Sequence, residues 1–394
     1  MYIDIIHFNI KMYNMIKRII TSQIEDYLNN SSRKIFFIWG PRRSGKTTLL
    51  QYFASKLGLP VFNFDLLSDR EYFIPRREIL EKIVSEHTII LIDEVQNYPE
   101  STISLKILHD EFNVKIIATG SSELRQKSGE FDSLTGRFTE TFCLPLSVEE
   151  IYKNMDTKLY RHQAAADIIA ESFQIYGSYP EIYADAKLNQ SEKIDLLQNI
   201  FNSYVLKDII NIYDLKNEKL ARDILLKLAL QIGSEVSLRE IASSLGANTT
   251  TVANYIEIFV KNYILIPLYS FKTNMCRAVS ENRKLYFYDL GIRNIVVKDF
   301  RDLYLRPDRG GVFENFIISE VDKKIKNGNK KVSMYFYREY SGKEVDLIIE
   351  DYQKKYSCFE IKVNRGKLRK NIFPLPHELK LINSLSYFDA LKVL

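Results

Sequence analysis

Residues 36–50 of this 394-residue chain read Phe-Phe-Ile-Trp-Gly-Pro-Arg-Arg-Ser-Gly-Lys-Thr-Thr-Leu-Leu. They contain the pattern G-x-x-x-x-G-K-T between an apolar run and a helical pattern, which is the order strand, loop and helix. Gly40 and Gly45 allow backbone conformations in which successive N–H groups face one anion, and the positive end of the following helix points at the same anion. This stretch therefore predicts a P-loop, which binds the phosphates of a nucleotide.

The residues of this loop have separate predicted tasks. Lys46 can reach the β- and γ-phosphates, and the hydroxyl of Thr47 can hold Mg²⁺. The predicted nucleotide-binding residues are Gly40, Pro41, Arg42, Arg43, Ser44, Gly45, Lys46, Thr47 and Thr48.

A second apolar strand ends in two acidic residues. Residues 88–94 read Thr-Ile-Ile-Leu-Ile-Asp-Glu, which is the Walker B pattern. Asp93 would hold Mg²⁺ through water, and Glu94 would act as the base that activates the attacking water. Gln96 follows two residues later and could orient Glu94. The plainer interpretation of such a sequence is a solvated strand end.

A third apolar strand ends in small polar residues. Residues 114–122 read Val-Lys-Ile-Ile-Ala-Thr-Gly-Ser-Ser. Ser121, or alternatively Thr119, could hydrogen-bond the γ-phosphate or the attacking water. The alternative is a serine-rich turn without a catalytic role.

These three motifs together resemble the AAA+ ATPases. More narrowly, residues 40–50, 92–96 and 119–122 are similar to a prokaryotic family whose members join an AAA+ ATPase domain to a C-terminal domain of unsettled function. The resemblance implies ATP and Mg²⁺ as cofactors and ATP hydrolysis as the activity. It also implies an α/β domain with a parallel sheet in the strand order 5-1-4-3-2.

The resemblance extends to an arginine before the fifth strand. Residues 134–138 read Leu-Thr-Gly-Arg-Phe and match the family's Gly-Arg step. In AAA+ assemblies an arginine near this point reaches the γ-phosphate of the neighbouring subunit, so Arg137 is the predicted arginine finger. This role implies self-association into a ring or another oligomer. The alternative is that Arg137 only pairs with a surface acid.

The middle of the chain combines a helical lid with a predicted winged helix. Residues 177–181 read Gly-Ser-Tyr-Pro-Glu and resemble a family step in the lid that takes the place of a second sensor arginine, with Ser178 where the family has glycine. Ser237 and Asn248 are predicted caps of two successive helices, and residues 263–269 suit a wing strand. Lys261 is the strongest cation on the exposed face of the second helix, so a packing role competes with DNA reading.

The C-terminal region carries a candidate Mg²⁺ site. Asp346 begins an apolar strand, and Glu360 and Lys362 share one face of the next strand. Carboxylates at these places could hold a metal that activates water, with Lys362 adding positive charge. The pattern resembles the PD-(D/E)XK restriction-endonuclease-like fold, in which Glu314 matches the helical acid, although Val345 stands where the fold often has proline. Residues 362–370 are basic and could contact a nucleic-acid backbone, although charge runs are usually solvated surface.

Composition adds few constraints. The net charge of +5 permits nucleic-acid binding without arguing for it. Cys143, Cys276 and Cys358 show no C-x-x-C spacing, so neither a zinc site nor a disulfide framework is indicated and the cytoplasm is the expected location. No run of about 18 apolar residues occurs, so we expect no membrane-spanning helix. The start codon is left open between Met1, Met12 and Met15.

The expected domains are an AAA+ core with an N-terminal helix (1–160), a helical lid or linker (161–234), a winged helix (235–270) and an α/β nuclease-like domain (271–394). The expected function is Mg-dependent ATP hydrolysis by an oligomer that acts on DNA through the nuclease-like domain, in repair, recombination, mobile-element or defence processes. The alternative is an ATP-controlled switch whose C-terminal domains bind partners or DNA without cleavage.

Overall fold

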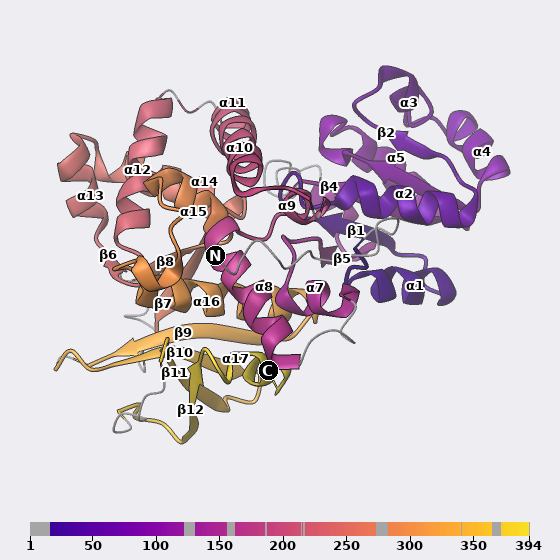
Figure 1. Cartoon of the computed structure of the whole chain (residues 1–394). Helices are drawn as coiled ribbons and strands as arrows, with labels where there is room; N and C mark the ends of the chain where they lie inside the picture. The colour runs from indigo at the N-terminus through magenta and orange to yellow at the C-terminus, as the bar shows by residue number, and fades with distance from the viewer. Residues whose placement is uncertain are drawn as a thin grey trace. The chain divides into compact units, whose positions relative to one another are not determined.

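The computed structural model describes residues 16–121, 131–155, 162–185, 187–213, 215, 217–272, 283–339, 341–364 and 372–393. The chain divides into two compact units, with the boundary between Pro145 and Leu146. Each unit has its own β-sheet (Figure 1).

The N-terminal unit is built on a five-stranded sheet. Its strands are β1 (Ile35–Trp39), β2 (Val61–Asn63), β3 (Ile89–Asp93), β4 (Lys115–Gly120) and β5 (Phe138–Phe142). They lie in the order β2-β3-β4-β1-β5, and every pairing is parallel. This is the predicted order 5-1-4-3-2 read from the other edge, so the prediction is confirmed.

Helices cover both faces of this sheet. They are α1 (Thr21–Asn29), α2 (Lys46–Leu57), α3 (Leu67–Glu71), α4 (Arg77–Glu86) and α5 (Ser101–Glu111), with 3₁₀ turns η1 (Val95–Asn97) and η2 (Phe131–Leu134). Successive strand residues point to opposite faces. Phe36 and Ile38 pack with α1 and α2, whereas Phe37 and Trp39 pack with α4 and α5. Burial on both faces explains why β1 is a continuous apolar run.

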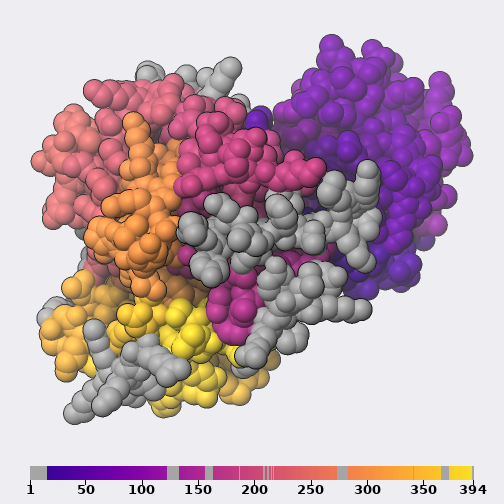
Figure 2. Space-filling model, viewed as in Figure 1, coloured from indigo at the N-terminus to yellow at the C-terminus, as the bar shows by residue number. Residues whose placement is uncertain are grey.

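The C-terminal unit opens with helices. They are α7 (Val148–Asn154), α8 (His162–Tyr176), α9 (Pro180–Tyr183), α10 (Gln190–Ile200), the π-helical segment η4 (Phe201–Asp208), α11 (Ile209–Ile212) and α12 (Glu218–Leu230). The later helices are α13 (Leu238–Leu245), α14 (Thr249–Lys261), α15 (Leu290–Val297), η6 (Leu303–Leu305), α16 (Arg309–Asn327) and α17 (Tyr387–Val393). Helices α12 and α13 contribute to the outer surface of this unit (Figure 2). Among the described residues, no helix is both long and apolar enough to cross a membrane.

One seven-stranded sheet runs through the C-terminal unit. Its strands are β6 (Glu235–Val236), β7 (Leu265–Ser270), β8 (Arg283–Phe287), β9 (Val332–Arg338), β10 (Glu344–Asp351), β11 (Tyr356–Lys362) and β12 (His377–Asn383). They lie in the order β12-β11-β10-β9-β7-β8-β6. The predicted winged helix and the predicted nuclease-like domain therefore share a sheet, joined where Tyr269 of β7 pairs with Tyr335 of β9. The expected boundary at residue 270 is not a break in this sheet, because pairing satisfies the backbone groups that a free edge of β7 would expose.

Local capping explains the two helices of the predicted winged helix. The Ser237 side chain accepts a hydrogen bond from the Glu240 N–H at 3.3 Å, and the Asn248 side chain accepts one from the Thr250 N–H at 2.9 Å. Both caps satisfy N–H groups that have no partner within their helix, so the predicted starts of α13 and α14 are confirmed.

The Gly-Ser-Tyr-Pro-Glu step is a buried junction between α8 and α9. Gly177 has a φ of +74°, and the Ser178 N–H donates to Asp289 at 2.6 Å. The ammonium of Lys323 donates to the Ser178 hydroxyl at 3.0 Å. Asp289 also caps α15 and Lys323 belongs to α16, so this short turn between α8 and α9 contacts two further helices. Its sensor-like role stays a prediction.

Candidate nucleotide-binding and hydrolysis site

The P-loop lies between β1 and α2 as predicted. Lys46 is 5% exposed, and its ammonium donates to the carbonyls of Gly40 at 3.0 Å and Pro41 at 2.8 Å. Gly45 has a φ of +93°, which favours glycine. A Cβ on Gly40 would lie 2.0 Å from the Cys143 carbonyl oxygen, so the loop passes too close to its neighbour for any side chain there.

Electrostatics at this site centre on the buried lysine. Burial lowers the pKa of Lys46, and the carboxylates of Glu94 and Asp93 oppose that shift. The lysine therefore lies within reach of the charges at the end of β3. A buried cation close to helix N–H groups is a suitable partner for an anionic phosphate.

Arg18 is a residue of this region that the sequence analysis missed. It is buried, and it donates to the Ser44 carbonyl at 2.6 Å, to the Cys143 sulfur at 3.3 Å and to the Leu144 carbonyl. It thereby connects the segment before α1 to the P-loop and to the residues after β5. Two of its partners are backbone oxygens, which leave no signature in a sequence.

The end of β3 brings both predicted acids to the carboxyl edge of the sheet. Asp93 is 2% exposed and accepts hydrogen bonds from the Thr119 hydroxyl and from the Glu94 N–H, the latter at 3.1 Å. Glu94 follows with a φ of +55°, an uncommon value for a side chain other than glycine. Glu94 is half-buried, so a base at this position remains partly accessible to water.

Gln96 connects the second and third motifs. Its amide nitrogen donates to the Glu94 carboxylate, and its amide oxygen accepts from the Ser121 N–H at 3.0 Å. The predicted contact between Gln96 and Glu94 is present. The amide thus holds Glu94 against the end of β4, which restricts where this carboxylate can point.

The structure separates the two candidates for the polar residue after β4. The Thr119 hydroxyl already donates to Asp93. The Ser121 hydroxyl oxygen is buried and has no hydrogen-bond partner among the described residues. A buried hydroxyl that lacks a partner is costly unless something else satisfies it, so Ser121 is the better placed to contact a bound ligand.

The residues of this site fit a Mg-nucleotide. Lys46 and the loop N–H groups suit phosphates, and the orphaned Ser121 hydroxyl suits an oxygen of the ligand or of water. Thr47, which is exposed in the first turn of α2, and the buried carboxylate of Asp93 are the residues that would hold Mg²⁺.

Arg137 lies at the amino ends of the strands, whereas the P-loop lies at their carboxyl ends. It directly precedes β5, whose first residue Phe138 pairs with Ile35 at the start of β1, whereas the P-loop follows the end of β1. Its guanidinium Nε donates to the Asp110 carboxylate at 2.8 and 3.1 Å. Hydrogen bonds from Arg137 and His109 lower the pKa of Asp110 to about 2. Arg137 therefore cannot reach the nucleotide of its own unit, and its predicted action on a neighbouring subunit stays a prediction.

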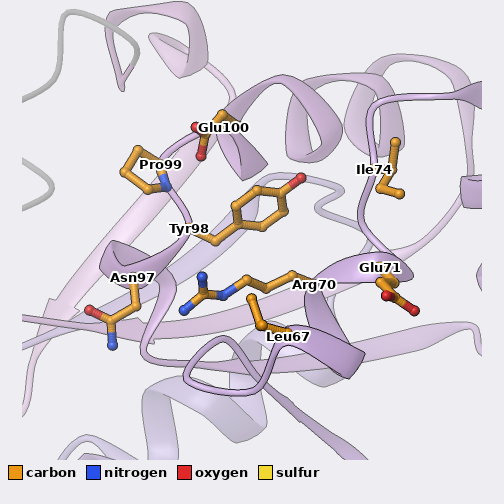
Figure 3. A pocket seen from close by; sticks show the side chains of 8 residues that line it. All are labelled: Leu67, Arg70, Glu71, Ile74, Asn97, Tyr98, Pro99 and Glu100. Carbon is orange, nitrogen blue, oxygen red and sulfur yellow. The ribbon is translucent and has the colours of Figure 1, made fainter.

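An open pocket lies beside the segment that follows Glu94 (Figure 3). Its volume is about 550 Å³, and its lining residues are Leu67, Arg70, Glu71, Ile74, Asn97, Tyr98, Pro99 and Glu100. It contains none of the predicted site residues. Its lining mixes apolar side chains with both signs of charge, a combination that no motif in the sequence indicated.

The carboxylates of the C-terminal unit are arranged differently from the prediction. Asp346 accepts a hydrogen bond from the Ile361 N–H at 2.7 Å, and Glu360 pairs with Lys362 at 2.9 Å. Glu314 is bound by the ammonium of Lys284 at 3.0 Å. Among the described residues, no group of three or more His, Cys, Asp or Glu side chains is placed to hold a metal ion.

In the described part of the chain, the predicted Mg²⁺ ligands Glu314, Asp346 and Glu360 are therefore not gathered into one metal-binding group, and another group of the protein contacts one oxygen of each. Lys284 and Glu344 belong to this region, and the sequence analysis missed both. Burial, together with the charges of Glu314 and Glu344, raises the pKa of Asp346 to about 7. Of the basic stretch 362–370, residues 365–370 lie outside the described residues.

Comparison with known protein families agrees with the P-loop geometry. Residues 32–152 match the family described as AAA domain. This match covers most of the N-terminal unit, including the P-loop and the ends of β3 and β4. Residues 170–302 and 309–376 match two families that are each described as a domain of unknown function (DUF8612 and DUF4143).

Two curated relatives are both uncharacterized proteins. One, from Haemophilus influenzae, is 27% identical over 280 residues, which cover 65% of this chain and 67% of the relative. The other, from Methanocaldococcus jannaschii, is 25% identical over 314 residues, which cover 70% of this chain and 65% of the relative. The chain thus spans about two thirds of the length of each.

Solved structures give only weak likenesses. The Aeropyrum pernix ORC1 protein in complex with DNA is 14% identical with a TM-score of 0.31, covering 71% of this chain and 90% of that one. The Thermotoga maritima RuvB Holliday junction branch migration motor is 19% identical with a TM-score of 0.27, and the match covers 59% of this chain and 81% of that one. Likenesses of this size carry no argument about function.

Proposed function

We propose that this protein binds ATP with Mg²⁺, hydrolyses it as an oligomer, and uses the cycle to act on DNA through its C-terminal unit. The observation that carries the proposal is the hydrogen-bonded group at the carboxyl edge of the N-terminal sheet. Gln96 contacts both Glu94 and Ser121 there, while Asp93 is held by Thr119. Such a group restrains a base and a metal ligand at the ends of neighbouring strands, next to a loop built for phosphates.

In the proposed mechanism, Lys46 and the N–H groups of the P-loop bind the β- and γ-phosphates, and Thr47 and Asp93 hold the metal. A Mg²⁺ ion held by Thr47 and Asp93 would supply positive charge that offsets the negative charge on the phosphates during transfer. Glu94 accepts a proton from the attacking water. Ser121 hydrogen-bonds the water or the γ-phosphate, and Arg137 of a neighbouring subunit stabilises the transferred group.

Two features of the C-terminal unit support an action on DNA. Helices α13 and α14 with strands β6, β7 and β8 follow the element order of a winged helix. The face of α14 exposes polar residues, one acid and one strong cation: Asn248, Thr249, Thr250, Asn254, Glu257 and Lys261. The element order of the remaining region supports the proposed nuclease-like domain. Helix α16 is followed by the antiparallel strands β9, β10 and β11, and then by β12, which is parallel to β11.

The second candidate function is an ATP-controlled switch that binds DNA or a partner without cutting. The ion pair of Lys284 with Glu314 favours it, because a protein ammonium group contacts a carboxylate that cleavage would require for the metal.

Steady-state ATP hydrolysis with single-stranded, duplex and branched DNA, each with Mg²⁺, tests the proposal. We expect one form to stimulate hydrolysis, and Glu94→Gln to abolish turnover while ATP binding is retained. The same samples are examined for cleavage products. Equal hydrolysis with and without every DNA form would contradict an action on DNA, and hydrolysis by Glu94→Gln at the wild-type rate would contradict the assigned base.

If cleavage products appear, Asp346→Ala should remove them while DNA binding is retained. Products that persist in this variant would place any cleavage elsewhere in the protein.

A further inference from the structure

We infer that Lys284 takes the place of a divalent cation in the carboxylate cluster of the C-terminal unit (Glu314, Glu344 and Asp346), so that this cluster is neutralised by the protein itself. The inference rests on the nuclease-like domain of the proposed function and favours the second candidate function, in which this domain binds DNA or a partner without cutting.

Lys284 contacts carboxylates from two separate elements. It lies on β8 and is 2% exposed. Its ammonium donates to Glu314 of α16 at 3.0 Å and also to Glu344 of β10. Tyr286, two residues along the same strand, donates its hydroxyl to the same oxygen of Glu314. One cation and one hydroxyl thus bind the same oxygen of Glu314, which was a predicted metal ligand.

The third carboxylate is also occupied. Asp346 accepts the N–H of Ile361 from the neighbouring strand β11. A magnesium ion needs oxygen ligands at about 2.0–2.1 Å in near-octahedral geometry, and it is repelled by an ammonium group at the same place. With Lys284 bound to Glu314 and Glu344, the described part of the chain contains no group of three carboxylates placed to hold a metal ion.

The surroundings keep Lys284 in position. Strand register pairs it with Leu268 of β7, and its ammonium lies 5.4 Å from the ring centre of the buried Phe336. Gly233 covers the other side of Glu314, since a Cβ on this glycine would lie 3.4 Å from the second oxygen of that carboxylate. A buried ammonium that left its carboxylates would lose the charges that offset its burial. Lys284 therefore acts as a fixed internal cation.

Manganese binding to the nucleotide-free, full-length protein tests this inference by electron paramagnetic resonance and calorimetry. The proteins compared are the wild type, Asp346→Asn, Lys284→Met and the double variant Lys284→Met/Asp346→Asn. We expect the wild type and Asp346→Asn to bind Mn²⁺ equally, because the cluster contributes no site. Lys284→Met should gain a site with a dissociation constant below about 1 mM, and Asp346→Asn should remove it again.

Lys326→Met is the matched control. Lys326 lies on α16 and pairs with one carboxylate, Asp322, at 2.8 Å. Its removal frees an acid outside the carboxylate cluster, so it should not create a Mn²⁺ site. A new site of equal affinity in this control would show that any unpaired acid suffices and would overturn the special position of Lys284.

Two other results would overturn the inference. One is Mn²⁺ binding by the wild type that Asp346→Asn removes, a comparison that remains decisive even if Lys284→Met does not fold. The other is a folded Lys284→Met protein, checked by circular dichroism, that binds no Mn²⁺. Neither result depends on ATP hydrolysis, so a failure of the proposed ATPase or of its stimulation by DNA is recognised separately.

Discussion

At the residue scale, Ser121 combines burial with an unsatisfied hydroxyl. Its backbone N–H is held by Gln96, so the side chain can be altered without releasing the strand end. We predict that Ser121→Ala lowers kcat about tenfold or more, because a donor to the reacting phosphate or water is lost. Its free energy of unfolding should change by less than about 0.5 kcal/mol, since the described residues provide this hydroxyl with no hydrogen bond that the substitution could remove. Steady-state kinetics and urea denaturation measure the two quantities.

Thr119→Val is the control for this prediction. It removes the hydroxyl that donates to Asp93 and leaves a buried carboxylate with one bond fewer. We expect it to destabilise the protein by about 1–3 kcal/mol, in contrast to Ser121→Ala. A wild-type kcat in Ser121→Ala would refute a role for this hydroxyl in hydrolysis.

A substitution of Arg137 tests whether this residue, which forms a surface ion pair in its own subunit, also acts on a neighbouring subunit. The side chains of Arg137 and its partner Asp110 are 31% and 35% exposed, so water screens the pair and it should contribute little to the free energy of unfolding. We predict that Arg137→Ala lowers kcat by about a thousandfold or more while the affinity for ATP stays close to wild type. ATPase assays and equilibrium binding of a fluorescent ATP analogue provide the measurement.

Asp110→Ala removes the same ion pair but keeps the arginine, so it should retain turnover. If both variants behave alike, or if Arg137→Ala loses most of its ATP affinity, the arginine serves the fold of its own subunit and not a neighbouring site.

At the scale of elements, the turn between α8 and α9 depends on one glycine. A Cβ on Gly177 would lie 2.1 Å from an Asp289 oxygen, and that carboxylate cannot move freely because it binds the N–H groups of Ser178 and Ile292. We predict that Gly177→Ala destabilises the C-terminal unit by about 2–3 kcal/mol, from the positive φ and the disturbed cap of α15 together. Urea denaturation followed by circular dichroism gives the value.

Gly246→Ala separates the two contributions. Gly246 ends α13 with a φ of +61°, and a Cβ there would meet no atom within 4 Å. Gly246→Ala should lower the free energy of unfolding only through the unfavourable backbone conformation, by about 1 kcal/mol. Equal costs for the two alanine variants would mean that Asp289 adapts and that the turn is less constrained than its contacts indicate.

At the scale of the whole molecule, the division between Pro145 and Leu146 predicts two unfolding events. We expect two thermal transitions in calorimetry. The Glu94→Gln variant is used so that ATP is not consumed. ATP with Mg²⁺ should raise the midpoint temperature of only one of the two transitions. Ligand at 100 times its dissociation constant stabilises the binding unit by about 2.7 kcal/mol.

Addition of Lys46→Ala to that variant should abolish the shift while both transitions remain. A single cooperative transition, or an equal rise of both, would show that the two units unfold together.

The N-terminal sheet could be predicted because its signals are local. The P-loop and the Walker B strand each lie within one short segment, and apolar runs mark strands that are buried on both faces. The chain order of these segments, together with the family resemblance, was enough for the strand order. The roles of Lys46, Asp93 and Glu94 are indicated by the same short patterns, since residues that follow parallel strands meet at one edge of the sheet.

The sequence by itself thus determined the AAA-type core, its phosphate loop and the caps of α13 and α14. Only the tertiary structure decided that Arg18 holds the P-loop, that Ser121 and not Thr119 has an uncommitted hydroxyl, and that Lys284 lies among the carboxylates. Lys284 meets Glu314 and Glu344 from 30 and 60 residues away. Short patterns cannot contain such partners, because the electrostatic free energy of a buried charge depends on groups that folding brings together from distant parts of the chain.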